Sequence, residues 1–349
     1  MKSETFSEGK VKISVPAGGT YERGVFYNPR AELTRDISVA ALQVFQRGFK
    51  QKMTVFDALS ASGARGLRYA KEVSGIKNVI LNDNNPFAVK IIKKNITLNK
   101  LGKKCKATKS DANASLRENV YTMIDLDPFG SPANFLDSAA RSIYHKGFLA
   151  ITATDQMVLC GRHPDACFKK YGIKTLKADY YSELGARIMI SSIIKALAIY
   201  DRAFVPVLTL ATEHYIRVFG EIEHSPKLND MINHFGYIRE GDEMIGPVYL
   251  GPIEDKKFCE DVRKEIEKRK FKQGDREIKL LKTIAAEADM PAFYYDIHKM
   301  AKREKKLVVG FNTIIESLRK QGYKASRTHF CETGIKTNAP AEKIIEMLI

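Results

Sequence analysis

The chain has 349 residues, of which 44% are hydrophobic and 28% charged, a balance that excludes a disordered or collagen-like protein and suits about two domains. Its five scattered cysteines include no CxxC pair, so the sequence favours neither a disulfide framework nor a structural zinc site and indicates a reducing compartment. The first residues form no signal-type apolar segment and no apolar run is long enough to span a bilayer, so we expect a cytoplasmic protein.

The net charge of +16 is concentrated in the first part of the chain. Residues 1–220 hold 33 basic and 19 acidic residues, whereas residues 221–349 hold 24 and 22. The stretch 84–110 has eight lysines and no acid, which is typical of a surface that contacts phosphates. A solvated lysine-rich surface is the alternative, but such surfaces usually alternate with Glu. We therefore predict a polyanionic partner that contacts Lys93, Lys94, Lys103 and Lys104.

The first predicted elements are short strands over residues 10–27. We expect them to turn at Gly18-Gly19 and to end at the aromatic pair Phe26-Tyr27. Apolar residues at helical spacing then predict a helix over residues 30–49, with Arg35 early in it.

The next unit, MTVFDALSASGARGLRYA (53–70), combines a short apolar strand, a turn of small residues and the start of a helix. This order is that of the first strand, loop and helix of a nucleotide-binding domain. The strand ends at Asp57, and the loop has no full GxGxxG fingerprint. We predict that Asp57, Ser60 and Ser62 lie at the cofactor.

Acidic residues follow the next predicted strands as well. The strand 78–81 leads to Asp83, 26 residues beyond Asp57, where an acid would receive the ribose hydroxyls of an adenosine. A lysine-rich helix (87–99) and a strand over 105–109 follow, and Ser110-Asp111-Ala112 can then place a carboxylate against the adenine amino group. Carboxylates after strands two, three and four favour an S-adenosylmethionine-dependent methyltransferase over a dehydrogenase, which would need the missing glycines.

We expect the chemistry at VYTMIDLDPFGSP (120–132), the fourth strand and its turn. Apolar residues lead into Asp127, Pro128 and Phe129, so a buried strand should present an acid and a ring on a tight turn. The Asp127 carboxylate and the Pro128 carbonyl could accept hydrogen bonds from an exocyclic amino group, while Phe129, together with Phe26, stacks on the base. An ordinary Asp-Pro turn beside a core Phe is the alternative interpretation.

Six segments together resemble a known enzyme family over nearly the whole chain. They are NPRAELTRDIS (28–38), FDALSASGARGLR (56–68), LNDNNP (81–86), DLDPFGSP (125–132), TATDQMVLCG (152–161) and GPVYLG (246–251). They are similar to the tRNA guanine-N2 dimethyltransferases, which make N2,N2-dimethylguanosine at position 26 of tRNA.

This resemblance implies an α/β fold with a class I (Rossmann-like) methyltransferase core, S-adenosylmethionine as cofactor and tRNA as partner, with Asp127 in the catalytic place. It also implies that the methyl-donor pocket is lined by Arg35, Arg65, Asp83, Asp111 and Ala112. Many relatives carry paired cysteines before the GPVYLG segment, but residues 229–244 have none, so we expect no metal site.

The rest of the chain is expected to complete the core and to add a second domain. A strand (146–153), an apolar helix (185–200) and a strand pair (204–211 and 215–223) should close the sheet, with Pro206 at an edge or a bulge. We expect the core to comprise residues 1–221 and a smaller α+β domain to comprise residues 222–349, with a contribution to tRNA binding. This second domain is predicted to contain helices over 255–271, 276–288, 293–305 and 311–321 and a strand over 323–330, an order that would suit a winged-helix-like arrangement.

Other polar residues are interpreted as structural. His145, His163 and His298 lack partners at useful spacing, and Cys160 with Cys167 in CGRHPDAC offers too few ligands for a metal. Arg327-Thr328-His329 is interpreted as a polar strand face, with RNA contact as the alternative.

The expected function is methyl transfer from S-adenosylmethionine to N2 of a guanine in tRNA, giving N2-methyl- and then N2,N2-dimethylguanosine, by a protein that we expect to be a monomer. Three alternatives remain. The acceptor is an exocyclic amine of adenine or cytosine in RNA or DNA, the chain is a non-enzymatic RNA-binding protein on this fold, or it is a nicotinamide-dependent oxidoreductase.

Overall fold

The computed structural model describes residues 3–349 except 17–24, 26 and 213. Among these residues the central element is a seven-stranded sheet in which five neighbouring strands are parallel and β9 is antiparallel to both of its neighbours. From edge to edge the strands are β5 (Cys105–Lys109), β4 (Ile76–Asp83), β3 (Met53–Asp57), β6 (Tyr121–Leu126), β7 (Ile143–Ala153), β9 (Ile216–His224) and β8 (Arg202–Ala211). The strands predicted for the core are therefore confirmed, and Pro206 lies at a bulge in an edge strand.

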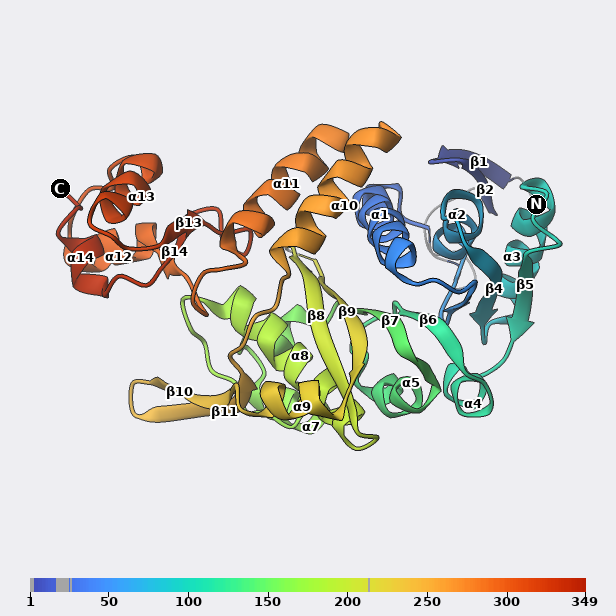
Figure 1. Ribbon diagram of the computed structural model, residues 1–349, viewed down its shortest axis with the longest axis horizontal. Helices are drawn as coiled ribbons and strands as arrows, with labels where there is room; N and C mark the ends of the chain where they lie inside the picture. Colours follow the sequence, from blue (N-terminus) through green and yellow to red (C-terminus); the bar gives the residue numbers. More distant parts are fainter. Residues whose placement is uncertain (1–2, 17–24, 26, 213) are drawn as a thin grey trace.

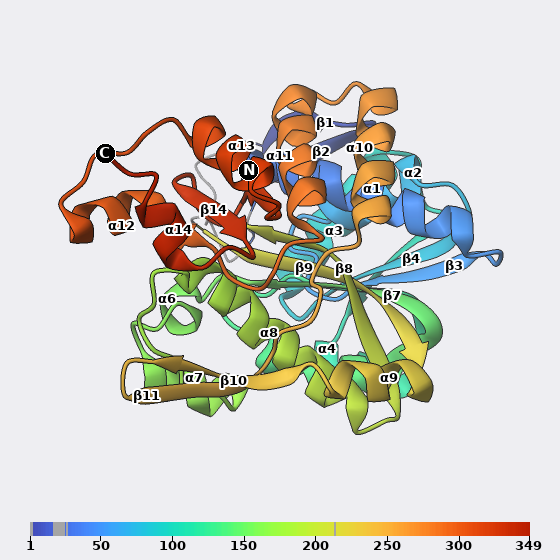
Figure 2. The same ribbon diagram turned by 60° about the vertical axis from the view of Figure 1, so that its left-hand side comes forward.

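Helices cover both faces of this sheet because alternate residues of each central strand point to opposite sides. On β7, for example, Phe148 and Ala150 pack in one core cluster, whereas Leu149 and Ile151 pack in the other. Figure 2 shows the two layers, with α1 above the sheet and α8 below it. The first layer contains α1 (Glu32–Gly48), α2 (Ala64–Glu72) and α3 (Pro86–Leu98), and the second contains α4 (Ala112–Glu118), α5 (Leu136–Ser142) and α8 (Tyr181–Ala198).

Among the described residues the chain starts with an antiparallel hairpin of β1 (Ser3–Glu8) and β2 (Val11–Pro16). The strand β2 lies within the predicted strand region, whereas β1 was not predicted. The turn lies at Gly9-Lys10, where Gly9 has a φ of +52°. The predicted turn at Gly18-Gly19 lies outside the described residues. The side chains of Asn95 on α3 and of Asn99 directly after it accept hydrogen bonds from the backbone N–H groups of Ser14 and Lys12, both at 2.8 Å, which fixes β2 beside α3.

Three short elements follow the central strands near the lower layer. They are α6 (Gln156–Leu159) and α7 (Pro164–Tyr171) after β7, and α9 (Ser225–Ile232) after β9. The hairpin β10 (Phe235–Glu240) and β11 (Glu243–Tyr249) extends from this side of the molecule (Figure 1).

Two long helices, α10 (Lys256–Arg269) and α11 (Gly274–Glu287), connect the core to a smaller C-terminal unit. The helix α10 packs against α1, and Arg269 donates hydrogen bonds to the Glu265 side chain and the Glu72 carbonyl. Figure 1 shows the C-terminal unit, in red, at the opposite end of the molecule from β5. A division of the chain at residues 221–222 stays a prediction, and β9 continues to His224.

The C-terminal unit has its own apolar core and a three-stranded sheet in the order β12-β14-β13. Its predicted strand 323–330 is shorter, because the Thr328 side chain and the His329 backbone turn to the Glu287 carboxylate. Two helices followed by a strand hairpin agree with the expected winged-helix-like arrangement. The elements are β12 (Tyr295–Asp296), α12 (Ile297–Glu304), α13 (Phe311–Lys320), β13 (Ala325–Arg327), β14 (Gly334–Thr337) and α14 (Ala341–Ile345). In the described part of the chain, none of the helices has the length and apolar character needed to cross a membrane.

Candidate active site at the carboxyl edge of the sheet

The carboxyl ends of the parallel strands bring the predicted acids to one edge of the sheet. Asp57 and Asp83 are the last residues of β3 and β4, Asp127 comes directly after β6, and Asp111 lies two residues beyond β5. The register pairs Asp57 with Asp125 on β6, so the centre of this edge lies between β3 and β6. Strand order reverses direction there, and ligands of open α/β sheets bind at such a point.

Asp127 makes a short ion pair with Arg65 of α2. The Arg65 Nη2 lies 2.5 Å from Asp127 Oδ2, and its Nη1 donates to the Ser38 Oγ at 2.9 Å. Burial alone would raise the pKa of the Asp127 carboxyl, but the charges of Arg65 and Arg217 and hydrogen bonds from Arg65 and Thr152 lower this pKa below its usual value. The Asp127 side chain remains 32% exposed, so an ionised carboxylate faces the site.

A buried polar network supports this pair from beneath. Arg217 on β9 lies 2.6 Å from the Asp125 carboxylate and donates to Thr152 Oγ1 at 2.6 Å. Tyr69 donates to the same Asp125 oxygen at 2.6 Å, and the proximity of that carboxylate adds to burial in raising the Tyr69 pKa. Sequence reasoning missed this network. Its sequence signals were Asp125, two residues before Asp127, Thr152 in the TATDQ segment and Arg217 within an apolar strand.

The turn after Asp127 presents Phe129 and is fixed on both sides. Phe129 is 63% exposed, and Gly130 has a φ of +82°, which a glycine adopts without strain. The Gly130 N–H donates to Thr154 Oγ1 at 2.6 Å, and the Thr154 N–H donates to the Gly130 carbonyl at 2.9 Å. Ser131 Oγ then donates to the Tyr171 hydroxyl at 2.8 Å. The predicted acid, proline and ring are thus held on one ordered turn.

The loop between β3 and α2 is fixed by its own polar residues. Gly63 precedes α2 with a φ of +80°, and the Asp57 Oδ2 accepts the Gly66 N–H at 3.0 Å. Burial and the neighbouring Asp125 raise the pKa of Asp57 to about 7. The Ser60 Oγ donates to the Asp57 carbonyl at 2.8 Å, and Ser62 is buried. These residues shape the loop, and their direct contact with a cofactor stays a prediction.

Two further acids stand beside this loop. Asp83 is partly exposed, and its two oxygens accept the backbone N–H groups of Ala61 and Asn85, each at 2.9 Å. Asp111 is exposed and caps α4 through the Ala114 N–H at 3.0 Å, and Ala112 is buried in the first turn of that helix. Each carboxylate oxygen has a second lone pair to offer a ligand.

Arg35 lies on α1 in a buried ion pair. Its Nε and Nη2 contact the Glu8 carboxylate at 2.6 and 2.5 Å, and Tyr27 donates to Glu8 Oε2 at 2.9 Å. The Arg35 guanidinium thus binds Glu8 within the protein. Its contact with the methyl donor stays a prediction. Phe26, predicted to stack on the base, lies outside the described residues.

The four lysines predicted to bind RNA do not converge on this edge. Lys93 and Lys94 are exposed on α3, but Lys103 and Lys104 precede β5 and therefore lie at the opposite, amino edge of the sheet. The Lys104 Nζ donates to the Ala70 carbonyl at 2.6 Å, and burial lowers its pKa. Lys103 and Lys104 therefore lie away from the carboxyl edge, and their contact with RNA stays a prediction.

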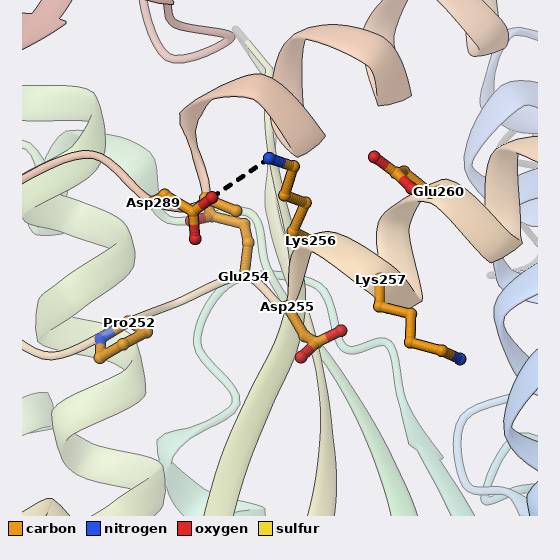
Figure 3. Close-up of a pocket in the computed structure, with 8 residues that line it drawn as sticks. Pro252, Glu254, Asp255, Lys256, Lys257, Glu260 and Asp289 are labelled. Carbon is orange, nitrogen blue, oxygen red and sulfur yellow. Dashed lines mark hydrogen bonds and ion pairs between the residues drawn. The ribbon is translucent and has the colours of Figure 1, made fainter. Parts of the chain in front are cut away.

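Hollows also lie elsewhere, around the segment that leads into α10. One hollow of about 480 Å³ has mixed charge, and its ion pair between Lys256 and Asp289 spans 3.3 Å (Figure 3). Burial and nearby carboxylates raise the pKa of Glu254 to about 8, against the opposing charge of Lys336. No aromatic side chain lines this hollow among the residues that the structure describes, so it does not fit a flat base.

The remaining candidates have structural roles. His329 is almost fully buried and lies 2.6 Å from Glu287, so it does not form an RNA-binding face. His145 stacks on His224 with ring centroids 3.3 Å apart. The five cysteines are free, and no group of three or more His, Cys, Asp or Glu side chains is placed to hold a metal ion within the described ranges.

Counted along the chain within the sheet, the strands have the order 3-2-1-4-5-7-6, and acids follow the first four. This fold and site define a class I, S-adenosylmethionine-dependent methyltransferase. The sequence matches the family described as "TRM: N2,N2-dimethylguanosine tRNA methyltransferase" over residues 9–241 and 238–349. The chain belongs to this family.

Individual relatives are similar to this chain over nearly its full length. A tRNA (guanine(26)-N(2))-dimethyltransferase of Pyrococcus horikoshii is 38% identical, with 98% of this chain and 97% of that protein covered. One of Methanosphaera stadtmanae is 35% identical, with 100% and 97% covered. The structure of Trm1 from Pyrococcus horikoshii in complex with S-adenosyl-L-methionine superposes with a TM-score of 0.91, at 36% identity and 99% coverage of both chains.

Proposed function

We propose that this protein transfers methyl groups from S-adenosylmethionine to N2 of a guanine in tRNA, at position 26, and makes N2-methyl- and then N2,N2-dimethylguanosine. The observation that carries the proposal is the ionised Asp127, held by Arg65 beside the exposed ring of Phe129. Membership of the dimethylguanosine family supports the choice of base and nucleic acid.

The loop and acids at the sheet edge fit the proposed cofactor. Asp83 is partly exposed, and its carboxylate is oriented by two backbone N–H groups, so its remaining lone pairs suit ribose hydroxyls. Asp111 is exposed at the start of α4 and suits the adenine amino group. S-adenosylmethionine supplies an electrophilic methyl group on a sulfonium. The roles of Arg35, Asp57, Ser60, Ser62 and Ala112 in this pocket remain part of the proposal.

Asp127 acts on the amino group of the base. The lone pair of guanine N2 is delocalised into the ring, so this nitrogen is a poor nucleophile. By accepting an N2–H hydrogen bond, together with the Pro128 carbonyl, the carboxylate localises that lone pair and stabilises positive charge as it develops. The proton becomes acidic as the new N–C bond forms, and Asp127 then accepts it and passes it to solvent.

Arg65 keeps Asp127 in the form that this role needs. Its guanidinium holds the carboxylate ionised and fixes Oδ2, and the lone pairs that the protein does not use are offered to the substrate. Phe129 stacks on the base, an interaction worth about 1–3 kcal/mol. A contribution of Phe26 from the opposite side is also proposed. The same carboxylate serves a second methylation once the monomethyl nitrogen rotates.

The proposal extends to partners and location. tRNA is the substrate, the C-terminal unit contributes to its binding, and the protein acts as a monomer in the cytoplasm. Lys93 and Lys94 on α3, with Lys103 and Lys104 beside β5, remain proposed phosphate contacts, although the second pair lies at the far edge of the sheet.

The test is methylation of an unmodified tRNA transcript followed by nucleoside mass spectrometry. We expect N2-methyl- and N2,N2-dimethylguanosine that map to position 26, and a transcript with adenosine at that position should not be methylated. Methylated adenosine or cytidine as the product would establish the alternative acceptor. A protein that binds tRNA but transfers no methyl group would overturn the enzymatic proposal.

A further inference from the structure

We propose that exposed residues on α7 and directly before and after it bind the tRNA strand that flanks the target guanosine. These residues, which we call the α7 surface, are Arg162, Phe168, Lys169, Lys174 and Lys177. The inference rests on the proposed function, because it assigns the part of the protein that holds the same substrate.

The helix α7 is fixed to the catalytic turn. The Tyr171 hydroxyl at its end accepts from Ser131 Oγ at 2.8 Å and donates to Asp155 Oδ1 at 2.7 Å. The Ser192 Oγ on α8 donates to the Tyr171 carbonyl at 2.9 Å, and Cys167 is fully buried. Because these contacts fix one side of α7, its exposed residues have a defined position relative to the turn.

That position is within reach of nucleotides next to a base on Phe129. Ser131 lies two residues beyond Phe129, and two residues of extended chain span at most about 7 Å. Phe168 lies three residues before Tyr171, so both side chains are neighbours on the helix. A strand whose target base is turned out onto Phe129 therefore passes beside Phe168.

The exposed side of α7 has the chemistry of a single-strand binding surface. Phe168 is 60% exposed, which is unusual for a large aromatic residue, and it stands directly before Lys169. Residues 162–177 contain five basic residues and one acid. Of these, Lys170 is paired with Asp155 at 3.0 Å, which leaves the cations of the α7 surface for phosphates. Aromatic rings that stack on bases beside cations that contact phosphates are the usual combination in such surfaces.

The α7 surface also continues toward the C-terminal unit. Asp179, just beyond it, lies 3.2 Å from Lys299 and 2.8 Å from Arg303 of α12. The α7 surface therefore lies next to the C-terminal unit, so a strand that crosses α7 continues toward that unit. By contrast, Lys52 and Lys77 are exposed at the start of β3 and β4, at the opposite edge of the sheet. These two lysines provide a matched control.

The experiment measures tRNA affinity at several salt concentrations for F168A, the double variant K169Q/K174Q and the control K52Q/K77Q. We expect F168A to weaken affinity about tenfold with little change in the salt slope, because it removes stacking alone. K169Q/K174Q should reduce the slope by about 1.4–1.8, since each lost phosphate contact removes about 0.7–0.9. The control should match wild type, and methyl-donor affinity should be unchanged throughout. F168Y keeps the ring and should bind tRNA with the affinity of wild type. Comparison of F168Y with F168A therefore distinguishes a loss of stacking from a folding defect.

The outcomes separate this inference from the proposed function. If the wild-type protein methylates tRNA but F168A and K169Q/K174Q both match the control, the α7 surface is overturned and the function stands. If the wild-type protein neither binds nor methylates tRNA, the function itself fails. A change in sedimentation of F168A without a change in tRNA affinity would assign the surface to self-association and would also overturn the proposal.

Discussion

The substitution Asp127→Asn tests the catalytic assignment most directly, because the amide keeps the shape of the side chain and removes its charge. The Asn oxygen can still accept a hydrogen bond from Arg65. The substitution should therefore weaken the contact with Arg65 but largely keep its geometry. Since the Asp127 side chain is 32% exposed, we expect little effect on folding. The loss should therefore fall on the chemical step.

The size of the loss can be estimated from the geometry of the transition state. Two unit charges about 4 Å apart interact by about 4 kcal/mol at an effective dielectric constant of about 20. The attacking nitrogen carries only part of a unit charge, and the partial exposure of Asp127 screens the interaction further. A loss of about 2–3 kcal/mol remains, which corresponds to a rate about 100-fold lower.

The assay is single-turnover methyl transfer to a tRNA transcript, with donor affinity measured by calorimetry and tRNA affinity by filter binding. The rate of Asp127→Asn should fall about 100-fold while both affinities stay within a few-fold of wild type. Asp137→Asn, at an exposed carboxylate on α5, is the matched control and should keep full activity. A rate for Asp127→Asn close to that of the control would refute the role of this carboxylate.

Three further predictions concern the donor pocket, the α3 lysines and the connection to the C-terminal unit. Asp83→Ala should weaken S-adenosylmethionine binding by about 1–3 kcal/mol, measured by calorimetry, because it removes charge-assisted hydrogen bonds to ribose. Lys93→Gln combined with Lys94→Gln should weaken tRNA binding and lower its salt slope by about 1.4–1.8. The raised pKa of Glu254, about 8, means that the folded protein keeps a proton that the unfolded chain loses above pH 4.5. The free energy of unfolding should therefore decline between about pH 4.5 and 8, by up to about 1.4 kcal/mol per pH unit, and Glu254→Gln should remove this part of the decline in denaturant titrations.

Each of these three predictions can be contradicted by a specific result. Unchanged donor affinity of Asp83→Ala would place the cofactor elsewhere on the sheet edge. If the Lys93 and Lys94 double variant has wild-type affinity and salt slope, these two lysines only form a solvated surface and do not contact tRNA. If wild type and Glu254→Gln have parallel stability curves between pH 5 and 8, the buried carboxyl is not the group that titrates.

The fold was predictable because its signals are local. Each central strand is a short apolar run, and the residues that follow, Asp57, Asp83, Asp111 and Asp127, are polar at the points where parallel strands must end together. The N-terminal hairpin of β1 and β2 was not predicted, because Gly9 alone gives a weaker turn signal than the two glycines at 18–19. Its true register depends on two Asn side chains in and directly after α3, more than 80 residues away, which no local pattern reveals.

The partners within the site were less predictable, since they join elements far apart in the chain. Arg65 was expected at the methyl donor, yet it contacts Asp127, 62 residues later. Arg217 was read only as part of a closing strand, although it lies under the site and contacts Asp125, 92 residues before it. An arginine in an apolar strand is a usable signal, because a buried cation requires a carboxylate partner.

The buried charges also explain why Asp127, and not a neighbouring acid, faces the substrate as a carboxylate. Asp57, Asp125 and Asp127 share two guanidinium groups, so the cluster cannot pair all three negative charges. Arg217 and Tyr69 both contact Asp125, while Arg65 lies 2.5 Å from Asp127 but 3.8 Å from Asp125. Asp57 has no such close cation, and burial with the nearby Asp125 raises its pKa to about 7, so it binds a proton far more readily than an ordinary aspartate. The acid with the lowered pKa is the one that remains partly exposed, and this division of roles leaves an ionised acceptor at the base.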